Sequence, residues 1–174
     1  MDQRLQEMLD HHEIRKALAL YCHACDRGDA ALMASVYAGE ESFDDHGLVQ
    51  ASGPEYAVRM SANIAERTDA VWHVLGQSMI VVDGDTAGVE TFFLGFMRLK
   101  PVDGVSKLNQ LAGRFVDRMV KIDGQWKIMH RTCVRDTSVT LTVTEDMQAG
   151  YGLKPGTRDA ADLGAALIGL AHRT

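Results

Sequence analysis

The sequence contains few of the residues that interrupt or cross-link a chain. Only three of its 174 residues are proline and only three are cysteine. An odd, small set of cysteines argues against a disulfide framework and is typical of reduced thiols. No apolar run approaches the roughly 18 residues that a membrane-spanning helix needs. We therefore expect one domain that folds around a hydrophobic core, with no membrane partner.

Positive charge is also scarce. The chain has 18 Lys and Arg residues against 24 Asp and Glu residues, a net charge of −6. This balance argues against a nucleic-acid partner, because nucleic acids attract a positive protein face. The first residues, MDQRLQEMLDHHE, are polar and acidic, unlike a signal peptide, so we expect a cytoplasmic protein.

The first part of the chain predicts three helices. Residues 3–26 carry an apolar stripe, and Gly28 ends this helix. Asp29 is the predicted N-cap of a short helix that runs to about Tyr37. Ser52 is followed by Gly-Pro-Glu, a helix start that predicts a third helix to about Arg67. The stripe of the first helix consists of Ile14, Leu18, Tyr21 and Cys25.

The second part predicts strands. A short strand is expected at Ser42–Gln50, whose Asp44, Asp45 and His46 we interpret first as turn and cap residues. Asp-Gly turns then join four long runs into a twisted antiparallel meander, and helices followed by such a sheet indicate an α+β fold. The four predicted strands are Val71–Val82, Thr86–Lys100, Ser106–Ile122 and Gln125–Val143.

The end of the chain predicts an extension to this domain. We place the domain at residues 1–143 and the extension at 144–174. Residues 144–158 contain several glycines and Pro155, which predicts a loop, and Asp159–His172 returns to a helical pattern. The sequence leaves open whether this helix covers its own pocket or packs on a neighbouring subunit.

Two residues from different predicted elements could perform proton transfer together. Asp26 lies at the end of the first helix, where the helix dipole disfavours a carboxylate, and His73 lies on an apolar strand. An imidazole can accept a proton while a carboxylate fixes its tautomer, and this chemistry needs no cofactor or metal. The alternative interpretation is a turn-forming aspartate and a hydrogen-bonded core histidine. A regular strand would place Gln77 and Met79 on the same face as His73.

Three further side chains could assist such a pair. Tyr21 has a hydroxyl that needs a partner if it is buried. Arg131 and Arg135 share a face of a regular strand with Met129 and Cys133, and an inward guanidinium could hold an oxyanion or a leaving group. An outward guanidinium would be ordinary surface charge.

The Cys22-x2-Cys25 spacing also suggests a metal or redox site. Both cysteines fall inside the helical pattern, and neither a second cysteine pair nor a preceding strand accompanies them. We interpret them as small packing residues and predict no metal.

Four segments together resemble the SnoaL-like branch of the NTF2-like superfamily over roughly residues 8–141. This resemblance implies a conical barrel with a deep apolar pocket, N-terminal helices packed on a curled sheet, and a dimer or trimer. The segments are EIRKALALYCHACDRGDAALMASVY, DDHG, WHVLGQSMIVVDGDTAGVETFF and GRFVDRMVKIDGQWKIMHR.

The resemblance also implies site residues. Asp26 and His73 match the carboxylate and histidine of its dehydratase and dehydrochlorinase members, while Tyr21 and Arg135 match a tyrosine and an arginine of bile acid 7α-dehydratase. The second acid of that dehydratase would fall near Phe96 and is missing. A further strand histidine of scytalone dehydratase has no clear counterpart, although His130 is a loose candidate.

These residues lead to one functional hypothesis and two alternatives. We expect a cofactor-independent lyase that eliminates water, halide or formaldehyde from a small apolar, aromatic or alicyclic substrate. Its catalytic residues would be His73 as base, with Asp26, Tyr21, Arg131 and Arg135. The superfamily also contains ketosteroid isomerases, polyketide cyclases and non-catalytic ligand-binding domains, so an isomerase or cyclase and a binding domain remain open.

Overall fold

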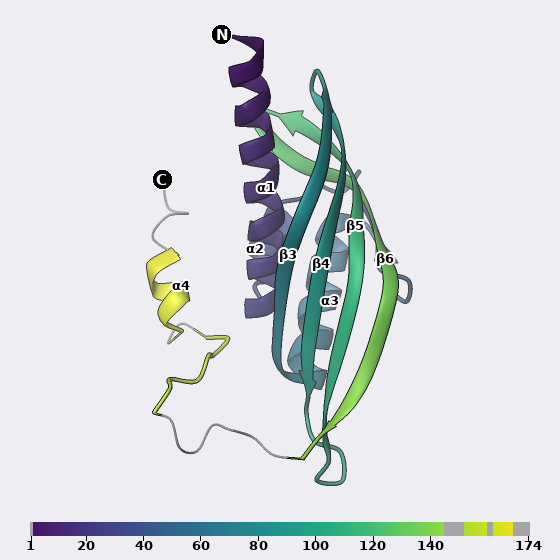
Figure 1. Ribbon diagram of the computed structural model, residues 1–174, viewed down its shortest axis with the longest axis vertical. Coiled ribbons are helices and arrows are strands. Elements are labelled where there is room, and N and C mark those ends of the chain that lie inside the picture. Colours follow the sequence, from purple (N-terminus) through teal and green to yellow (C-terminus); the bar gives the residue numbers. More distant parts are fainter. Residues whose placement is uncertain (1, 145–151, 160–161, 169–174) are drawn as a thin grey trace.

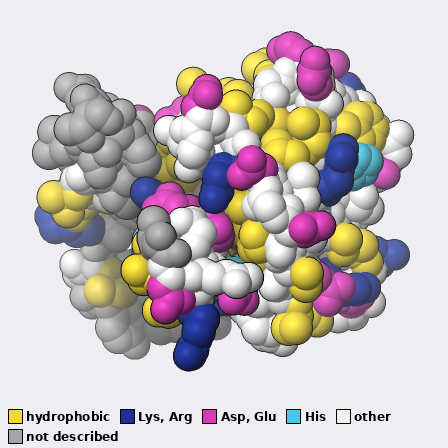
Figure 2. Space-filling view, turned by 90° about the horizontal axis from the view of Figure 1, so that it is seen from above, with side chains coloured by type: hydrophobic (Ala, Val, Ile, Leu, Met, Phe, Trp, Pro, Cys, Tyr) yellow, Lys and Arg dark blue, Asp and Glu magenta, His cyan; other side chains and the backbone are white. Residues whose placement is uncertain are grey.

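The computed structural model describes residues 2–144, 152–159 and 162–168. Its helices lie on one side of a curled sheet, and the segment that carries α4 lies beside α1 (Figure 1). Seen from above, the surface mixes hydrophobic side chains with acidic and basic ones (Figure 2). No helix in the described ranges is both long and apolar enough to cross a membrane.

The predicted helices are present. Helix α1 spans Gln3–Arg27 and ends at Gly28, whose φ of 68° is in the left-handed region that favours glycine. Its predicted apolar stripe is buried. Helix α2 spans Ala30–Ser35 and is capped by Asp29, and α3 spans Gly53–Arg67, where the Ser52 side chain accepts a hydrogen bond from the Glu55 amide.

Four long strands form the predicted antiparallel meander. The strands are β3 (Thr68–Asp83), β4 (Thr86–Leu99), β5 (Ser106–Ile122) and β6 (Gln125–Val143). At the β5–β6 turn both Asp123 and Gly124 have positive φ, as a type I′ hairpin requires.

The short strand predicted at Ser42–Gln50 is wrong in detail. This segment forms two strands, β1 (Phe43–Asp45) and β2 (Gln50–Ala51), which pair antiparallel. The chain turns at Gly47, whose φ is 73° and whose amide donates to the Asp45 carboxylate. Strand β1 also pairs in parallel with β6, so the sheet is mixed, with the order β2-β1-β6-β5-β4-β3. Because β2 and β3 remain as edges, the sheet curls without closing into a barrel.

Two β-bulges change which residues face the helices. The register shifts between Leu75 and Ser78, so Ser78 rather than Gln77 continues the inward row that includes His73. A second shift beside Met129 lets Trp126 and Ile128 face inward together with Arg131, whereas a regular strand would have separated them. In β3 the predicted faces are therefore wrong beyond Leu75. In β6 the prediction placed Trp126 and Ile128 on the face opposite Arg131, which is wrong.

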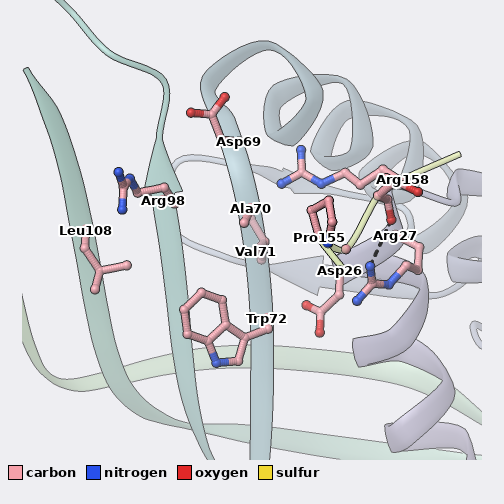
Figure 3. A pocket seen from close by; sticks show the side chains of 12 residues that line it. Asp26, Arg27, Asp69, Ala70, Val71, Trp72, Arg98, Leu108, Pro155 and Arg158 are labelled. Atoms are coloured by element: carbon pink, nitrogen blue, oxygen red, sulfur yellow. Dashed lines mark hydrogen bonds between the residues drawn. The ribbon is translucent and has the colours of Figure 1, made fainter. Parts of the chain in front are cut away.

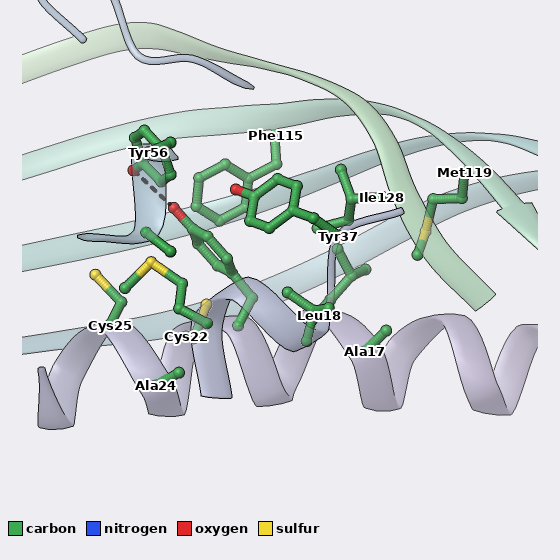
Figure 4. Packing of buried hydrophobic residues seen from close by; sticks show 14 of the residues in the cluster. Ala17, Leu18, Cys22, Ala24, Cys25, Tyr37, Tyr56, Phe115, Met119 and Ile128 are labelled. Carbon is green, nitrogen blue, oxygen red and sulfur yellow. Dashed lines mark hydrogen bonds between the residues drawn. The ribbon is translucent and has the colours of Figure 1, made fainter. Parts of the chain in front are cut away.

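The core lies between α1 and the concave side of the sheet. Figure 4 shows aromatic and sulfur-containing side chains meeting there, with Phe115 and Tyr37 above the helix that carries Cys22 and Cys25. All three cysteines are free, and burial raises the pKa of Cys22 to about 12. Together with the apolar side chains this cluster forms one continuous core.

The C-terminal extension is described only in part. Residues 152–158 have no regular structure, and the predicted helix at Asp159–His172 is observed as α4, Leu163–Ile168. The remainder of both predictions lies outside the described residues. The Arg27 guanidinium donates to the Thr157 carbonyl at 3.0 Å and to the Asp162 carboxylate at 3.2 Å, which attaches the extension to the end of α1.

Candidate active site

The structure brings Asp26 and His73 into direct contact. The Nδ1 atom of His73 lies 2.6 Å from Oδ1 of Asp26, and the backbone N–H of His73 donates to Oδ2 at 3.0 Å. Asp26 comes from the last turn of α1 and His73 from the concave face of the edge strand β3. The two side chains are only 12% and 15% exposed, respectively. Both carboxylate oxygens are therefore satisfied, which offsets the cost of an acid at a helix carboxyl end.

This geometry determines what the imidazole can do. When the ring is neutral and Nδ1 donates to the carboxylate, Nε2 keeps a free lone pair and can act as a base. If Nε2 takes a proton, the adjacent carboxylate stabilises the resulting charge. The ring packs near Phe93 and Phe115, with centroid separations of 6.0 and 6.5 Å. The His73 side chain therefore faces aromatic, partly water-excluded surroundings.

A cavity of about 640 Å³ lies on the other side of the carboxylate. Asp26 is part of its wall, whereas His73 is not. Figure 3 shows Trp72 and Arg98 on one side of β3, with Asp26, Arg27 and Arg158 on the other. The wall is both apolar and charged, in contrast to the deep apolar pocket that the resemblance implied.

The C-terminal extension supplies one wall of this cavity. Residues 155–158 line it, and the Arg158 guanidinium donates to the Thr68 carbonyl at 3.0 Å and to the Thr68 hydroxyl at 2.8 Å. Burial, together with the nearby Arg27, lowers the pKa of Arg158. The extension thus packs against the edge strand of its own chain, beside the Asp26 carboxylate.

Tyr21 and Arg131 lie together but apart from the Asp26–His73 pair. Tyr21 is 1% exposed, its hydroxyl is 3.0 Å from that of Tyr56, and its ring packs edge-on against Phe115. Burial, and then the neighbouring Tyr56 and Asp44, raise the pKa of Tyr21 well above its usual value. Tyr21 is therefore a neutral phenol, and its ring neighbour Phe115 also lies beside His73.

Arg131 is committed to a buried ion pair. Its Nε and Nη2 atoms each donate to the Asp117 carboxylate at 2.7 Å, and both side chains are fully buried. The guanidinium carbon lies 4.1 Å from the centroid of the Tyr21 ring and 4.2 Å from that of Phe115. Burial alone would lower the pKa of Arg131, but the charge of Asp117 outweighs this effect and raises it. The Arg131 guanidinium therefore packs against the rings of Tyr21 and Phe115 and helps to fix their positions.

Arg135 is separated from both groups. It is exposed, and its Nη1 atom donates to the Ser138 hydroxyl at 3.1 Å. No contact joins it to Asp26 or His73 within the part of the chain that the structure describes. Of the five predicted site residues, the structure thus pairs two, places two beneath Phe115 and leaves one at the surface.

Sequence reasoning missed a second carboxylate–imidazole pair. His46 Nδ1 contacts Oδ1 of Asp44, which is fully buried and also accepts a hydrogen bond from the Tyr37 hydroxyl. The turn interpretation holds for Asp45, which accepts from the Gly47 amide, but not for Asp44. The signal in the sequence was the Asp-x-His spacing, because residues two apart on a strand point to the same side.

One group of side chains has the proximity that a metal site needs. Ligand atoms of Cys25, Asp26 and His73 all lie within 4.8 Å of one another. Burial, followed by the charge of Asp26, raises the pKa of the Cys25 thiol, so its sulfur stays protonated and is a poor metal ligand. Both Asp26 oxygens already accept hydrogen bonds from His73. These features favour a hydrogen-bonded acid–base pair over a metal centre.

Comparisons with known proteins agree with this architecture. Residues 6–132 match the SnoaL-like domain family. A type 2 hexachlorocyclohexane dehydrochlorinase superimposes with a TM-score of 0.71 at 17% identity, covering 88% of this chain and 98% of that one. A type 3 dehydrochlorinase from Novosphingobium barchaimii gives 0.70 at 18% identity, with 88% and 99% covered.

A candidate scytalone dehydratase from Novosphingobium aromaticivorans has a TM-score of 0.69 at 19% identity, with 84% of this chain and 97% of that chain covered. At these identities the similarity establishes the fold alone. A comparison with curated protein sequences gave no match.

Proposed function

The chain belongs to the SnoaL-like domain family, and on this premise we propose that it is a cofactor-independent lyase. Its substrate would be a small, largely apolar molecule with an aromatic or alicyclic ring. The observation that carries the proposal is the double hydrogen bond by which Asp26 holds both the backbone and the ring of His73. A carboxylate that serves only to end a helix has no need of such a partner.

His73 is the general base in this reaction. Its Nε2 atom takes a proton from an acidic C–H bond, and the electron pair of that bond forms a carbon–carbon double bond as the leaving group departs. Asp26 holds the Nδ1 proton, keeps the ring in the basic tautomer and stabilises the imidazolium. General base catalysis of this kind contributes roughly 10²- to 10⁴-fold to a rate.

The surroundings of His73 suit an apolar substrate. The stacked pair Phe93 and Phe115, with centroids 4.2 Å apart, is buried and forms an aromatic wall beside the imidazole. Tyr21 and Arg131 hold Phe115 from beneath, so in this proposal they position the wall rather than contact the substrate. Surroundings that exclude water strengthen the interaction between Asp26 and the imidazolium. Arg135, at the surface, has no assigned part.

The names of the structural neighbours support the same reaction class. A dehydrochlorinase and a dehydratase both remove a proton and a leaving group from adjacent atoms. The low identities transfer no residue role to this chain, so the assignment of His73 and Asp26 depends on their geometry here.

A substrate panel tests the proposal. Wild-type protein is incubated with β-hydroxycyclohexanone, β-chlorocyclohexanone and the corresponding β-substituted tetralones, and the unsaturated products are identified by chromatography. We expect elimination, with a rate that falls by at least about 10²-fold in His73→Gln and in Asp26→Asn. The control is His12→Gln, which changes an exposed histidine of α1. Isomerised products, or full turnover in both site variants, would contradict a lyase based on this pair.

We also propose that the protein is a homo-oligomer. The sheet face opposite the helices exposes large apolar side chains, including Trp72 at 41%, Phe92 at 37% and Leu94 at 46%. The Trp72 ring stacks on Phe96 with a centroid separation of 4.8 Å, which creates a flat aromatic area. Contiguous apolar surface of this kind is typical of interfaces between subunits.

A further inference from the structure

Asp44 and His46 form a second pair with the same contact between an imidazole Nδ1 and a carboxylate oxygen as in the first pair. In both pairs Nδ1 of the imidazole contacts a carboxylate oxygen, and in both the imidazole side chain is 15% exposed. The Asp44 carboxylate is fully buried and is held in addition by the Tyr37 hydroxyl. His46 is therefore oriented by a fixed partner, as His73 is by Asp26.

The other nitrogen of His46 is only weakly occupied. Nε2 lies 3.5 Å from the Tyr21 hydroxyl, at the long limit of a hydrogen bond. The ring stacks on Tyr56 with a centroid separation of 4.8 Å and an interplanar angle of 29°, which fixes its plane. Nε2 is thus a positioned donor or acceptor whose protein partner a ligand could replace at small cost.

Both imidazoles lie beside the same aromatic ring. The centroid of Phe115 is 6.0 Å from His46 and 6.5 Å from His73. The two histidines come from elements far apart in the sequence, the β1–β2 turn and β3. Phe115 itself is 1% exposed, because Phe93 stacks on it and the Arg131 guanidinium covers its ring. A substrate would therefore have to lie between the two imidazoles, where it could reach one with a C–H bond and the other with its leaving group.

We propose that His46 is the general acid of the elimination whose base is His73, an inference that rests on the proposed function. His73 Nε2 takes the proton of the C–H bond, whose electron pair becomes the new double bond. The bond to the leaving oxygen breaks, its electron pair stays on oxygen, and Nε2–H of the His46 imidazolium protonates that oxygen to release water. Asp44 holds the other ring proton throughout. Exchange with solvent then removes one proton from His73 and returns one to His46.

The tyrosines around His46 are less suited to this role. Tyr21 and Tyr56 are each 1% exposed, and their hydroxyls lie 3.0 Å from each other. Burial raises the pKa of both phenols well above the usual value, which makes them weak acids. They position the His46 ring, and His46 presents the proton.

Leaving-group dependence distinguishes an acid from a structural residue. Hydroxide needs a proton to depart, whereas chloride does not. The probes are a β-hydroxy ketone and a β-chloro ketone on whichever ring skeleton the wild-type protein turns over. We expect His46→Gln to slow the loss of water by at least about 10²-fold and the loss of chloride by less than about tenfold. His73→Gln should slow both losses alike, and His12→Gln neither.

Each result decides between the two proposals. If His73→Gln abolishes both reactions while His46→Gln lowers both equally or neither, the role of His46 is wrong and the lyase proposal stands. If wild-type protein turns over neither probe, or His73→Gln leaves turnover intact, the lyase proposal fails and His46 loses its role with it. Circular dichroism and thermal unfolding check that the variants fold. Restoration of water loss in His46→Ala by added imidazole would support proton donation by the ring.

Discussion

The buried ion pair between Arg131 and Asp117 lies against the rings of Tyr21 and Phe115, and its contribution to stability can be measured. The change is Asp117→Asn, which keeps the shape of the side chain and removes its charge. Two hydrogen bonds of 2.7 Å join the partners, and both side chains are fully buried. The variant therefore leaves a guanidinium charge without its counter-ion in the core, where water cannot solvate it.

We expect this variant to lose about 3–5 kcal/mol of unfolding free energy, the cost of breaking a buried pair by removing one partner. With an m-value of about 2 kcal/mol per M, the urea midpoint would fall by roughly 1.5–2.5 M. The assay is urea unfolding followed by circular dichroism. A midpoint within about 0.3 M of the wild-type value would refute the reasoning, because it would mean that the buried charge had found another way to be solvated.

The chain offers a matched control at its surface. Arg114 forms the same two-bond contact with Asp136, at 3.0 Å for each bond, where the Asp136 side chain is 43% exposed. Asp136→Asn should hardly move the midpoint, because water solvates both groups once they separate. A double variant, Asp117→Leu with Arg131→Met, should lose less free energy than the two single variants added together.

Two further predictions concern alkaline stability and assembly. Burial raises the pKa of the Cys22 and Cys133 thiols from 9.0 to about 12, and that of three core tyrosines well above 10.0. Since the unfolded chain releases these protons at lower pH, stability is fully present below about pH 9 and falls as the pH rises toward 12. The test is an alkaline titration that follows unfolding by circular dichroism and tyrosine ionisation by absorbance. If tyrosinate absorbance rose at a lower pH than unfolding, the buried phenols would not have raised pKa values and the prediction would be wrong. For assembly, Trp72→Glu should convert the oligomer to a monomer, as measured by size-exclusion chromatography with light scattering. The control is Val58→Glu, at an exposed site of α3, which should leave the oligomer intact. A wild-type protein that is itself a monomer would contradict the proposed interface.

Much of the fold could be predicted from local chemistry. The Asp-Gly pairs specify tight turns because they tolerate positive φ, and Ser52 with Glu55 marks a helix start by its hydrogen bond. The contact between Asp26 and His73 followed from the resemblance to elimination enzymes, because the strand pattern alone did not say which way His73 points. Their catalytic role stays a prediction.

The side-chain directions could not be predicted as well. A bulge adds one residue to a strand, and the prediction assumed regular alternation through Leu75 and Met129. Gln77 was therefore placed beside His73 instead of Ser78, and Trp126 was placed on the face opposite Arg131. For the same reason the sequence did not show that Arg131 forms an ion pair with Asp117, a residue 14 positions away on the neighbouring strand. In β3 the glycine at position 76 was the available signal for the bulge. His46 was missed because a turn interpretation explained its neighbour Asp45 and was extended to the whole segment.

The tautomer of His73 tests the central claim most directly. Nitrogen NMR of protein labelled at histidine reports which ring nitrogen carries the proton, and His73→Gln assigns the signal. At a pH where the ring is neutral, we predict that Nδ1 is protonated toward Asp26 and that Nε2 is bare. In Asp26→Asn the tautomers should mix or reverse. A wild-type ring with its proton on Nε2 would contradict the account, because that nitrogen could not then take a proton from any substrate.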